Sequence, residues 1–145
     1  MALNKAITTL ENERDHSDSN YSITHQGDLD NSSPAFNANS GLIWSGYRPS
    51  DDVTYYKFFI PGNMFAVGIM EKMHTLLGEL GLDASLASRA NTLASEVRAA
   101  IETYGVYNHP TYGKIYAFEV NGDSISPESR VQVKTCSAIS VISPT

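Results

Sequence analysis

The sequence predicts a mainly α-helical fold with a few short strands. Apolar residues recur at helical spacing along two long segments, residues 64–80 and 84–104. Only Gly81, Leu82 and Asp83 separate these segments, so we expect two antiparallel helices joined as a hairpin. The chain has 145 residues, 41% of them hydrophobic, which suffices for one globular domain with a core.

A shorter helix is predicted at the start of the chain. Apolar residues there follow the i, i+3, i+4, i+7 spacing of one helix face: Leu3, Ala6, Ile7 and Leu10. The charged residues 11–15 are expected to form the solvated end of this helix. Residues 20–39 are polar and rich in turn-forming side chains, and we expect most of this segment to be loop.

Residues that start and stop helices mark the ends of the two long helices. Asn63, after Pro61–Gly62, can cap the first helix by accepting backbone N–H bonds, and Gly81 ends that helix. Asp83 can cap the second helix, and Gly105 closes it. The apolar stripe of the second helix consists of Leu86, Ala90, Leu93, Val97, Ala100, Ile101 and Tyr104.

A strand and a tail are predicted after the helical hairpin. Residues 114–120 favour a short strand, and Asn121–Gly122 is a turn dipeptide that ends it. Residues 123–145 are rich in Ser and contain no aromatic side chain, so we expect a disordered tail.

Composition excludes several classes of function. The net charge of −6 and the scattered basic residues argue against nucleic acid or an anionic membrane as partner. No signal peptide or membrane-spanning run is visible, and the compartment stays unassigned. There is no glycine-rich phosphate loop, and we expect no cofactor. We also expect no metal site, because the histidines lack metal-ligand spacing: His16, His25, His74 and His109.

The segment from Gly41 to Ala66 concentrates the chemistry of a sugar site. Trp44 and Tyr47 can stack on a pyranose face, Arg48 can hold hydroxyls, and the Asp51–Asp52 pair can supply a carboxyl group that moves a proton. Adjacent carboxylates point in different directions, so only one of the two is expected to face the bond that breaks.

A structural interpretation of the same residues stays open. Ser50 or Asp51 could cap a helix, Arg48 could form a local salt bridge, and the aromatic side chains could belong to the core. Glu119, near the end of the predicted strand, could reach a cleft or face solvent.

Three blocks of the sequence resemble glycoside hydrolase family 125, the metal-independent exo-acting α-1,6-mannosidases. They are Trp-Ser-Gly-Tyr-Arg-Pro-Ser-Asp-Asp at 44–52, Ile-Pro-Gly-Asn-Met-Phe-Ala-Val at 60–67, and Ile-Tyr-Ala-Phe-Glu-Val-Asn-Gly at 115–122. The resemblance runs from Leu3 to Gly122. It implies an (α/α)6 barrel of the six-hairpin glycosidase type and an inverting mechanism, with an aspartic acid as general acid and a glutamate as general base.

The resemblance also implies roles for single residues. The general acid would be Asp51 or Asp52, and the motif does not distinguish between them. Arg48, Ser50 and Asn63 occupy motif positions expected to contact sugar, Trp44 and Tyr47 are further candidates, and Glu119 would line the pocket. The implied partner is an α-mannoside oligosaccharide; the oligomeric state is left open.

Two departures from the family pattern concern the end of the chain. Asn121 stands where the family has aspartate, and the downstream segment that includes the general base does not follow Gly122. We therefore expect residues 1–122 to form a partial catalytic domain, residues 123–145 to form a divergent tail, and the chain alone to be inactive. The alternative is a fragment that binds mannosides without catalysis or serves as a helical interaction module.

Overall fold

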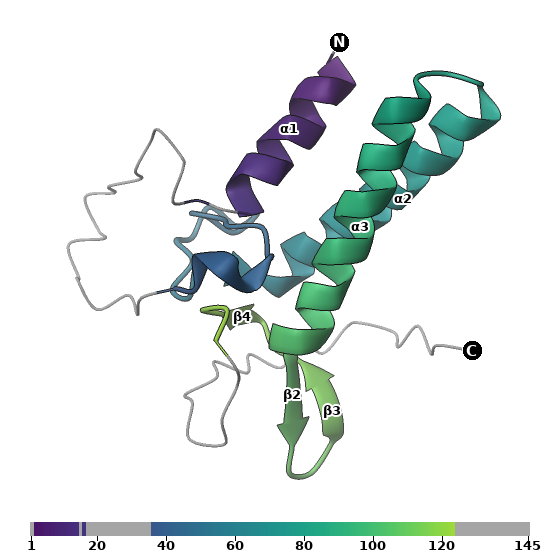
Figure 1. Cartoon of the computed structure of the whole chain (residues 1–145). Coiled ribbons are helices and arrows are strands. Elements are labelled where there is room, and N and C mark those ends of the chain that lie inside the picture. The colour runs from purple at the N-terminus through teal and green to yellow at the C-terminus, as the bar shows by residue number, and fades with distance from the viewer. Residues whose placement is uncertain (1, 15, 17–35, 124–145) are drawn as a thin grey trace.

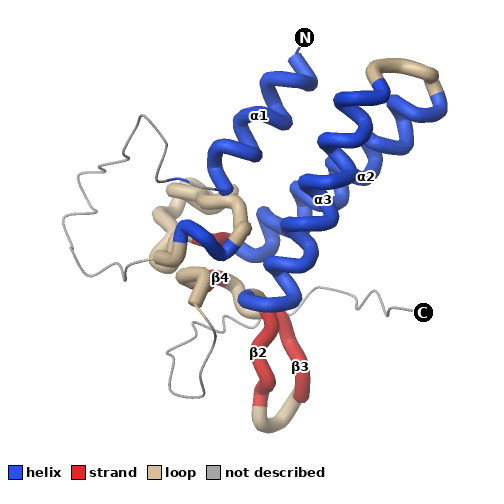
Figure 2. The backbone as a smooth tube through the Cα atoms, viewed as in Figure 1, coloured by secondary structure: helices blue, strands red, loops and turns tan. Residues whose placement is uncertain are grey.

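The computed structural model describes residues 2–14, 16 and 36–123, and within these ranges the protein is mainly helical (Figures 1 and 2). Residues 124–145 of the predicted tail and residues 20–35 of the predicted loop lie outside the described ranges. In chain order the elements are α1 (Ala2–Arg14), the 3-10 helix η2 (Ala38–Ser40), β1 (Phe58–Phe59), α2 (Ile60–Glu79), α3 (Ala84–Tyr104), β2 (Val106–His109), β3 (Gly113–Tyr116) and β4 (Glu119–Val120).

The helical hairpin of α2 and α3 is confirmed and forms the centre of the fold (Figure 1). Gly81 adopts a left-handed conformation with φ +60° after the last turn of α2. Its N–H donates to the carbonyl of Gly78, and the N–H of Leu82 donates to the carbonyl of Leu77. These two bonds form a Schellman motif, which satisfies carbonyls that the helix end leaves unpaired. Asp83 then caps α3 by accepting from the N–H of Leu86 at 3.0 Å.

The predicted start of α2 is wrong by one helical turn. The helix begins at Ile60, its N-cap is Phe59, and Pro61 lies in its first turn, where a missing N–H costs no helical hydrogen bond. Asn63 is therefore inside α2 and is not its cap. Its Oδ1 accepts from the N–H of Ile43 at 2.8 Å, and its Nδ2 donates to the carbonyls of Ile43 and Phe59 at 3.0 Å. This buried amide fastens the segment before the site to α2.

Helix α1 lies against α3, and Arg89 makes most of the polar contacts between them, beside the ion pair of Arg14 with Glu96. Arg89 of α3 donates Nε and Nη2 to the two carboxylate oxygens of Glu11, at 3.2 and 2.5 Å. It also donates to Asn4 Oδ1 at 2.5 Å and to Thr8 Oγ1 at 2.9 Å. Ile7 of α1 is fully buried in the core. The predicted short helix is thus confirmed, and polar contacts surround its apolar contact with the hairpin.

The core lies between the helices and the segment from Leu42 to Trp44. Every residue of the predicted α3 stripe is buried except Tyr104, which packs against the core while partly exposed.

None of the helices within the described part of the chain is long and apolar enough to cross a membrane.

The predicted strand at residues 114–120 is divided in two. Its first part is β3, which pairs with β2 as an antiparallel hairpin, and its last part is β4, which pairs antiparallel with β1. Ala117 and Phe118 interrupt it because their backbone groups bond elsewhere. Ala117 N–H donates to Gly105 O at 2.8 Å, and Ile60 N–H donates to Phe118 O at 3.1 Å. The interruption sends β4 back toward the start of α2, beside the segment with the candidate catalytic residues.

Candidate active site

The Asp51–Asp52 pair lies in a tight loop closed by backbone bonds. Tyr47 and Val53 form an isolated antiparallel bridge, and Arg48 N–H donates to the carbonyl of Asp52 at 2.8 Å. Within the loop, Asp51 N–H donates to the carbonyl of Arg48 at 3.0 Å. Asp51 has φ +65°, a left-handed conformation that Asp adopts more readily than most residues. The backbone therefore fixes where the loop presents both carboxyl groups.

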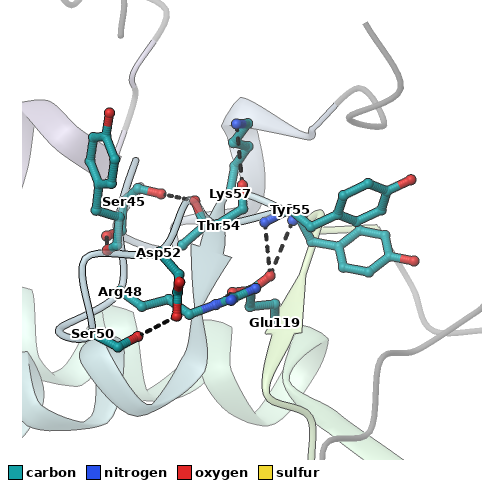
Figure 3. A network of polar contacts seen from close by, with 10 residues as sticks. Ser45, Arg48, Ser50, Asp52, Thr54, Tyr55, Lys57 and Glu119 are labelled. Atoms are coloured by element: carbon teal, nitrogen blue, oxygen red, sulfur yellow. Dashed lines mark hydrogen bonds and ion pairs between the residues drawn. The ribbon is translucent and has the colours of Figure 1, made fainter. Parts of the chain in front are cut away.

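Both aspartates are exposed, as a group that meets substrate must be. Ser50 Oγ donates to Asp52 Oδ2 at 2.8 Å, which orients the second carboxylate (Figure 3). The alternative in which Ser50 or Asp51 caps a helix is wrong, because the next helix begins only at Ile60. The loop is a turn of its own and not the start of a helix.

Glu119 of β4 is the buried anchor of this region. It is 2% exposed, and its Oε1 accepts from Arg48 Nε at 2.5 Å. Its Oε2 accepts from the backbone N–H groups of Tyr55 at 3.0 Å and Tyr56 at 3.4 Å. Figure 3 shows the carboxylate between the Arg48 side chain and the Tyr55 backbone. The salt bridge of Arg48 is thus not local, as one interpretation of the sequence expected, but reaches a distant strand.

Arg48 is held on more than one side. The hydrogen bond to Glu119 raises the pKa of Arg48, although partial burial acts in the opposite direction. The guanidinium also lies over the Phe118 ring, with Cζ 5.5 Å from the ring centroid, a cation–π arrangement. A buried carboxylate is stable only when it is paired and hydrogen-bonded, and the segment from 48 to 56 supplies the three partners observed for Glu119. Glu119 and Arg48 therefore join β4 to both halves of the segment from 48 to 56.

Thr54 is a structural residue of the site that sequence reasoning missed. It is fully buried, its N–H donates to the carbonyl of Gly46 at 3.0 Å, and its hydroxyl donates to the carbonyl of Ser45. Lys57 Nζ donates to the Thr54 carbonyl at 3.3 Å (Figure 3). Nothing in the local sequence predicts that a threonine within a polar segment is fully buried.

The structure separates two of the other candidate residues, Trp44 and Asn63, from the loop. Trp44 is 8% exposed, and its ring stacks on His16 with centroids 3.6 Å apart and an angle of 4° between the planes. Asn63 is buried and bonds to Ile43 as described above. Tyr47 is half-buried at the closing bridge of the loop. The structure thus brings Tyr47, Arg48, Ser50, Asp51, Asp52 and Glu119 together and places Trp44 and Asn63 in the core.

Among the described residues, no group of three or more His, Cys, Asp or Glu side chains is placed to hold a metal ion. The observed chemistry of the site is thus that of exposed carboxyl groups, one arginine and a buried carboxylate.

The sequence matches the family of metal-independent α-mannosidases (GH125) over residues 3–126. The chain belongs to this family. The matched range includes α1 except Ala2, the loop with Asp51 and Asp52, the helical hairpin and all the described strands. The domain boundary predicted at residue 122 lies inside this range, four residues before its end.

A solved structure of a metal-independent α-mannosidase from Streptococcus pneumoniae, in a non-productive complex with α-1,6-mannobiose, resembles this GH125 chain. The two are 32% identical with a TM-score of 0.73, and the match covers 83% of this chain and 30% of the bacterial one. The meiotically up-regulated gene 157 protein of Schizosaccharomyces pombe is 38% identical over 86 residues, which are 59% of this chain and 17% of the yeast protein.

The chain thus spans less than a third of either relative. Its mainly helical fold with a few short strands corresponds to part of an (α/α)6 barrel, as the resemblance in the sequence implied.

Proposed function

We propose that this chain forms the general-acid part of an α-mannosidase active site. The reaction is hydrolysis of an α-1,6-mannoside from its non-reducing end, with inversion at the anomeric carbon. The observation that carries the proposal is the loop of residues 48–52, which presents two exposed carboxyl groups on a backbone fixed by the ion pair of partly buried Arg48 with buried Glu119. The GH125 family supplies the substrate class, and the mannobiose in the related structure supports it.

In an inverting glycosidase, one carboxylic acid protonates the leaving oxygen while a carboxylate activates water on the opposite face of the sugar. Asp51 or Asp52 is the acid in this proposal. Arg48 bonds to Glu119 through Nε, and its Nη groups are donors of the right kind for sugar hydroxyls. Ser50 orients the Asp52 carboxylate, and Glu119 holds the Arg48 side chain in position. Among the described residues of the site, Glu119 is enclosed by Arg48 and two backbone N–H groups, so the proposal places the general base in another part of the barrel.

A residue-resolved titration tests the substrate class. Methyl α-mannoside is added to the isotopically labelled chain, and backbone amide signals are followed by NMR. Signals of residues 48–57 should shift, and Arg48→Ala should abolish the shifts. Arg98→Ala is the matched control because Arg98 forms an exposed ion pair with Glu71 on the helical hairpin. A loop whose signals stay fixed at saturating sugar would contradict the proposal.

A comparison of substrates with different leaving groups identifies which aspartate is the acid. A good leaving group departs without protonation, so loss of the acid slows hydrolysis of a disaccharide much more than hydrolysis of an activated aryl mannoside. In the Streptococcus pneumoniae enzyme, the residues that align with Asp51 and Asp52 are identified and, where they are aspartates, changed one at a time to Asn. The acid is the one whose loss slows α-1,6-mannobiose by about a hundredfold or more while the aryl mannoside is largely retained. Equal losses on both substrates for both variants would show that neither residue is the acid.

A further inference from the structure

The side of α2 that faces away from the core carries a row of apolar side chains. The buried residues of this helix share one side of it at helical spacing, among them Asn63, Val67, Met70 and Leu77. A second set follows the same spacing on the opposite side and is exposed: Phe65, Ile69, Leu76 and Leu80. We call this second set the outer face of α2.

The outer face is unusually apolar for an exposed surface. Phe65, Leu76 and Leu80 are each more than half exposed, and so is Leu82 in the turn that follows α2. Single exposed apolar side chains are common on proteins, but a continuous row of them is typical of an interaction surface. The outer face therefore has the character of one half of a contact between helices.

A shallow groove beside this apolar row contains two charges that the fold does not use. The groove has a volume of about 510 Å³ and is lined by Gly68, Glu71, Lys72, Thr75, Leu76 and Glu79. A Cβ atom added at Gly68 would meet no atom within 4 Å, so the groove is open there. Glu71 pairs with Arg98 of α3, whereas Lys72 and Glu79 form no ion pair with any residue that the structure describes.

The spacing of Lys72 and Glu79 matches a second copy of the same helix. They are seven residues apart, which is two helical turns, and Leu76 lies between them. If two copies of α2 lie antiparallel about a two-fold axis at Leu76, each Lys72 lies opposite Glu79 of the other copy, and Ile69 approaches Leu82. A parallel pair would place each of these charges opposite its own kind. Charge complementarity thus favours the antiparallel arrangement.

We propose that the outer face of α2 is the contact surface of a homodimer and is covered by the outer face of a second copy of this chain. The contact is self-complementary, with the two Leu76 side chains at its centre and a Lys72–Glu79 pair on each side of them. The turn between α2 and α3 lies at the end of the hairpin away from β4 (Figure 1). A dimer centred on Leu76 therefore leaves the loop of Asp51 and Asp52 accessible, and this inference does not depend on the proposed function.

The test measures the dissociation constant of the dimer by analytical ultracentrifugation of the 145-residue chain at a series of concentrations. Lys72→Glu and Glu79→Lys each place like charges opposite one another at both pairs. Each substitution should raise the dissociation constant by about tenfold or more, because it acts twice in a symmetric dimer. An equimolar mixture of the two variants again places opposite charges at both pairs. The mixture should therefore dimerise with a dissociation constant within about threefold of the parent.

Two further variants separate the contact from general effects of charge and folding. Leu76→Gln removes the apolar side chain at the centre and should also weaken the dimer by about tenfold. Lys5→Glu makes the same change of charge as Lys72→Glu on an exposed position of α1, and it should leave the dissociation constant within about twofold of the parent. Circular dichroism and urea denaturation establish that each variant is folded, as expected for substitutions of exposed residues.

Several results would overturn the inference. One is a chain that stays monomeric at about 1 mM, where even a weak contact is populated. Another is a mixture of the two charge variants that dimerises no better than either variant alone. Assemblies that keep growing beyond two chains would show a contact that is not self-complementary. A monomer in which a soluble paramagnetic agent fails to reach the methyl groups of Leu76 and Leu80 would show that another segment of the same chain covers the outer face.

Discussion

Glu119 shows how a single buried carboxylate organises the candidate site. Its side chain is 1% exposed, and its contacts with Arg48 and with two backbone N–H groups all stabilise the segment from 48 to 56. Glu119→Gln keeps the shape and removes the charge, so the partly buried Arg48 guanidinium loses its counter-ion. Removing one partner of a buried ion pair typically costs about 3 kcal/mol, and we expect this decrease in the free energy of unfolding, measured by urea denaturation.

The matched control for Glu119→Gln is Glu71→Gln. Glu71 pairs with Arg98 on the helical hairpin, where both side chains are about half exposed, at 48% and 57%. Exposed pairs contribute little, so this variant should unfold within about 0.5 kcal/mol of the parent. Equal effects of the two substitutions would mean that the Arg48–Glu119 pair does not anchor the loop.

Tyr116 makes the stability of the contact between β3 and α3 dependent on alkaline pH. Its hydroxyl donates to Glu102, and this bond, together with burial, raises the pKa of Tyr116 above its ordinary value of 10.0. The folded state therefore retains this proton at a pH where the unfolded state has lost it. The resulting stability is fully present below about pH 10 and is lost as the pH rises through the folded-state pKa.

This dependence can be followed by the ultraviolet absorbance of tyrosinate during an alkaline titration. Glu102→Gln removes the charged acceptor and should lower the pKa of Tyr116 toward 10.0. Tyr116→Phe should remove the late-titrating step altogether. A titration curve that neither substitution changes would contradict the assigned cause.

Among the secondary-structure elements, the turn between α2 and α3 allows a test with opposite expected signs. Gly81 has φ +60°, which costs a residue with a Cβ about 1 kcal/mol, so Gly81→Ala should destabilise the protein by that amount. Gly78 lies within α2, and a Cβ there would meet nothing within 4 Å. Gly78→Ala should therefore stabilise by about 0.5–1 kcal/mol, because alanine favours helix.

Thermal unfolding of the two alanine variants, beside the parent, measures both effects. A higher midpoint for Gly81→Ala than for Gly78→Ala would contradict the assignment of the Schellman motif to this turn.

The elements that could be predicted from the sequence depend on local signals. Asp83 caps α3 as predicted, and Gly81 ends α2, because each acts on backbone groups within a few residues. The start of α2 was wrong because Pro61–Gly62 suggested a turn, whereas proline is compatible with a first helical turn. The buried amide of Asn63 binds a segment twenty residues away, which no local pattern indicates.

The same contrast between local signals and contacts of distant segments applies to the candidate site. The two carboxylates and Arg48 could be named as candidates because their motif is contiguous in sequence. Glu119 was named as a candidate too, but its pairing with Arg48 was not predicted, since the two residues are 71 positions apart and the burial of Glu119 depends on how β4 returns to β1. The division of the strand at Ala117–Phe118 likewise depends on backbone partners in Gly105 and Ile60. Contacts between segments that are distant in sequence depend on the assembled fold, so the spacing of residues along the chain does not predict them.

For the molecule as a whole, the remaining question is whether this part of the barrel can act without the rest. Inverting hydrolysis needs an acid and a base about 6.5–9.5 Å apart on opposite sides of the sugar. Asp51 and Asp52 are neighbours in one loop, and Glu119 is enclosed by Arg48 and two backbone amides. In the proposed function, the described residues of the site thus offer an acid without an accessible partner base.

We therefore expect the purified 145-residue chain to release no mannose from α-1,6-mannobiose, although its loop signals respond to the sugar. Loss of one of two cooperating catalytic groups lowers kcat by about 10⁴-fold or more, which places the rate below detection in an ordinary assay. Mannose release is measured enzymatically, with the Streptococcus pneumoniae mannosidase as the positive control. Release by the chain that disappears in Asp51→Asn or in Asp52→Asn would contradict this expectation, because that aspartate would then work with a base inside the chain itself. Release that survives both substitutions would instead point to a contaminating glycosidase.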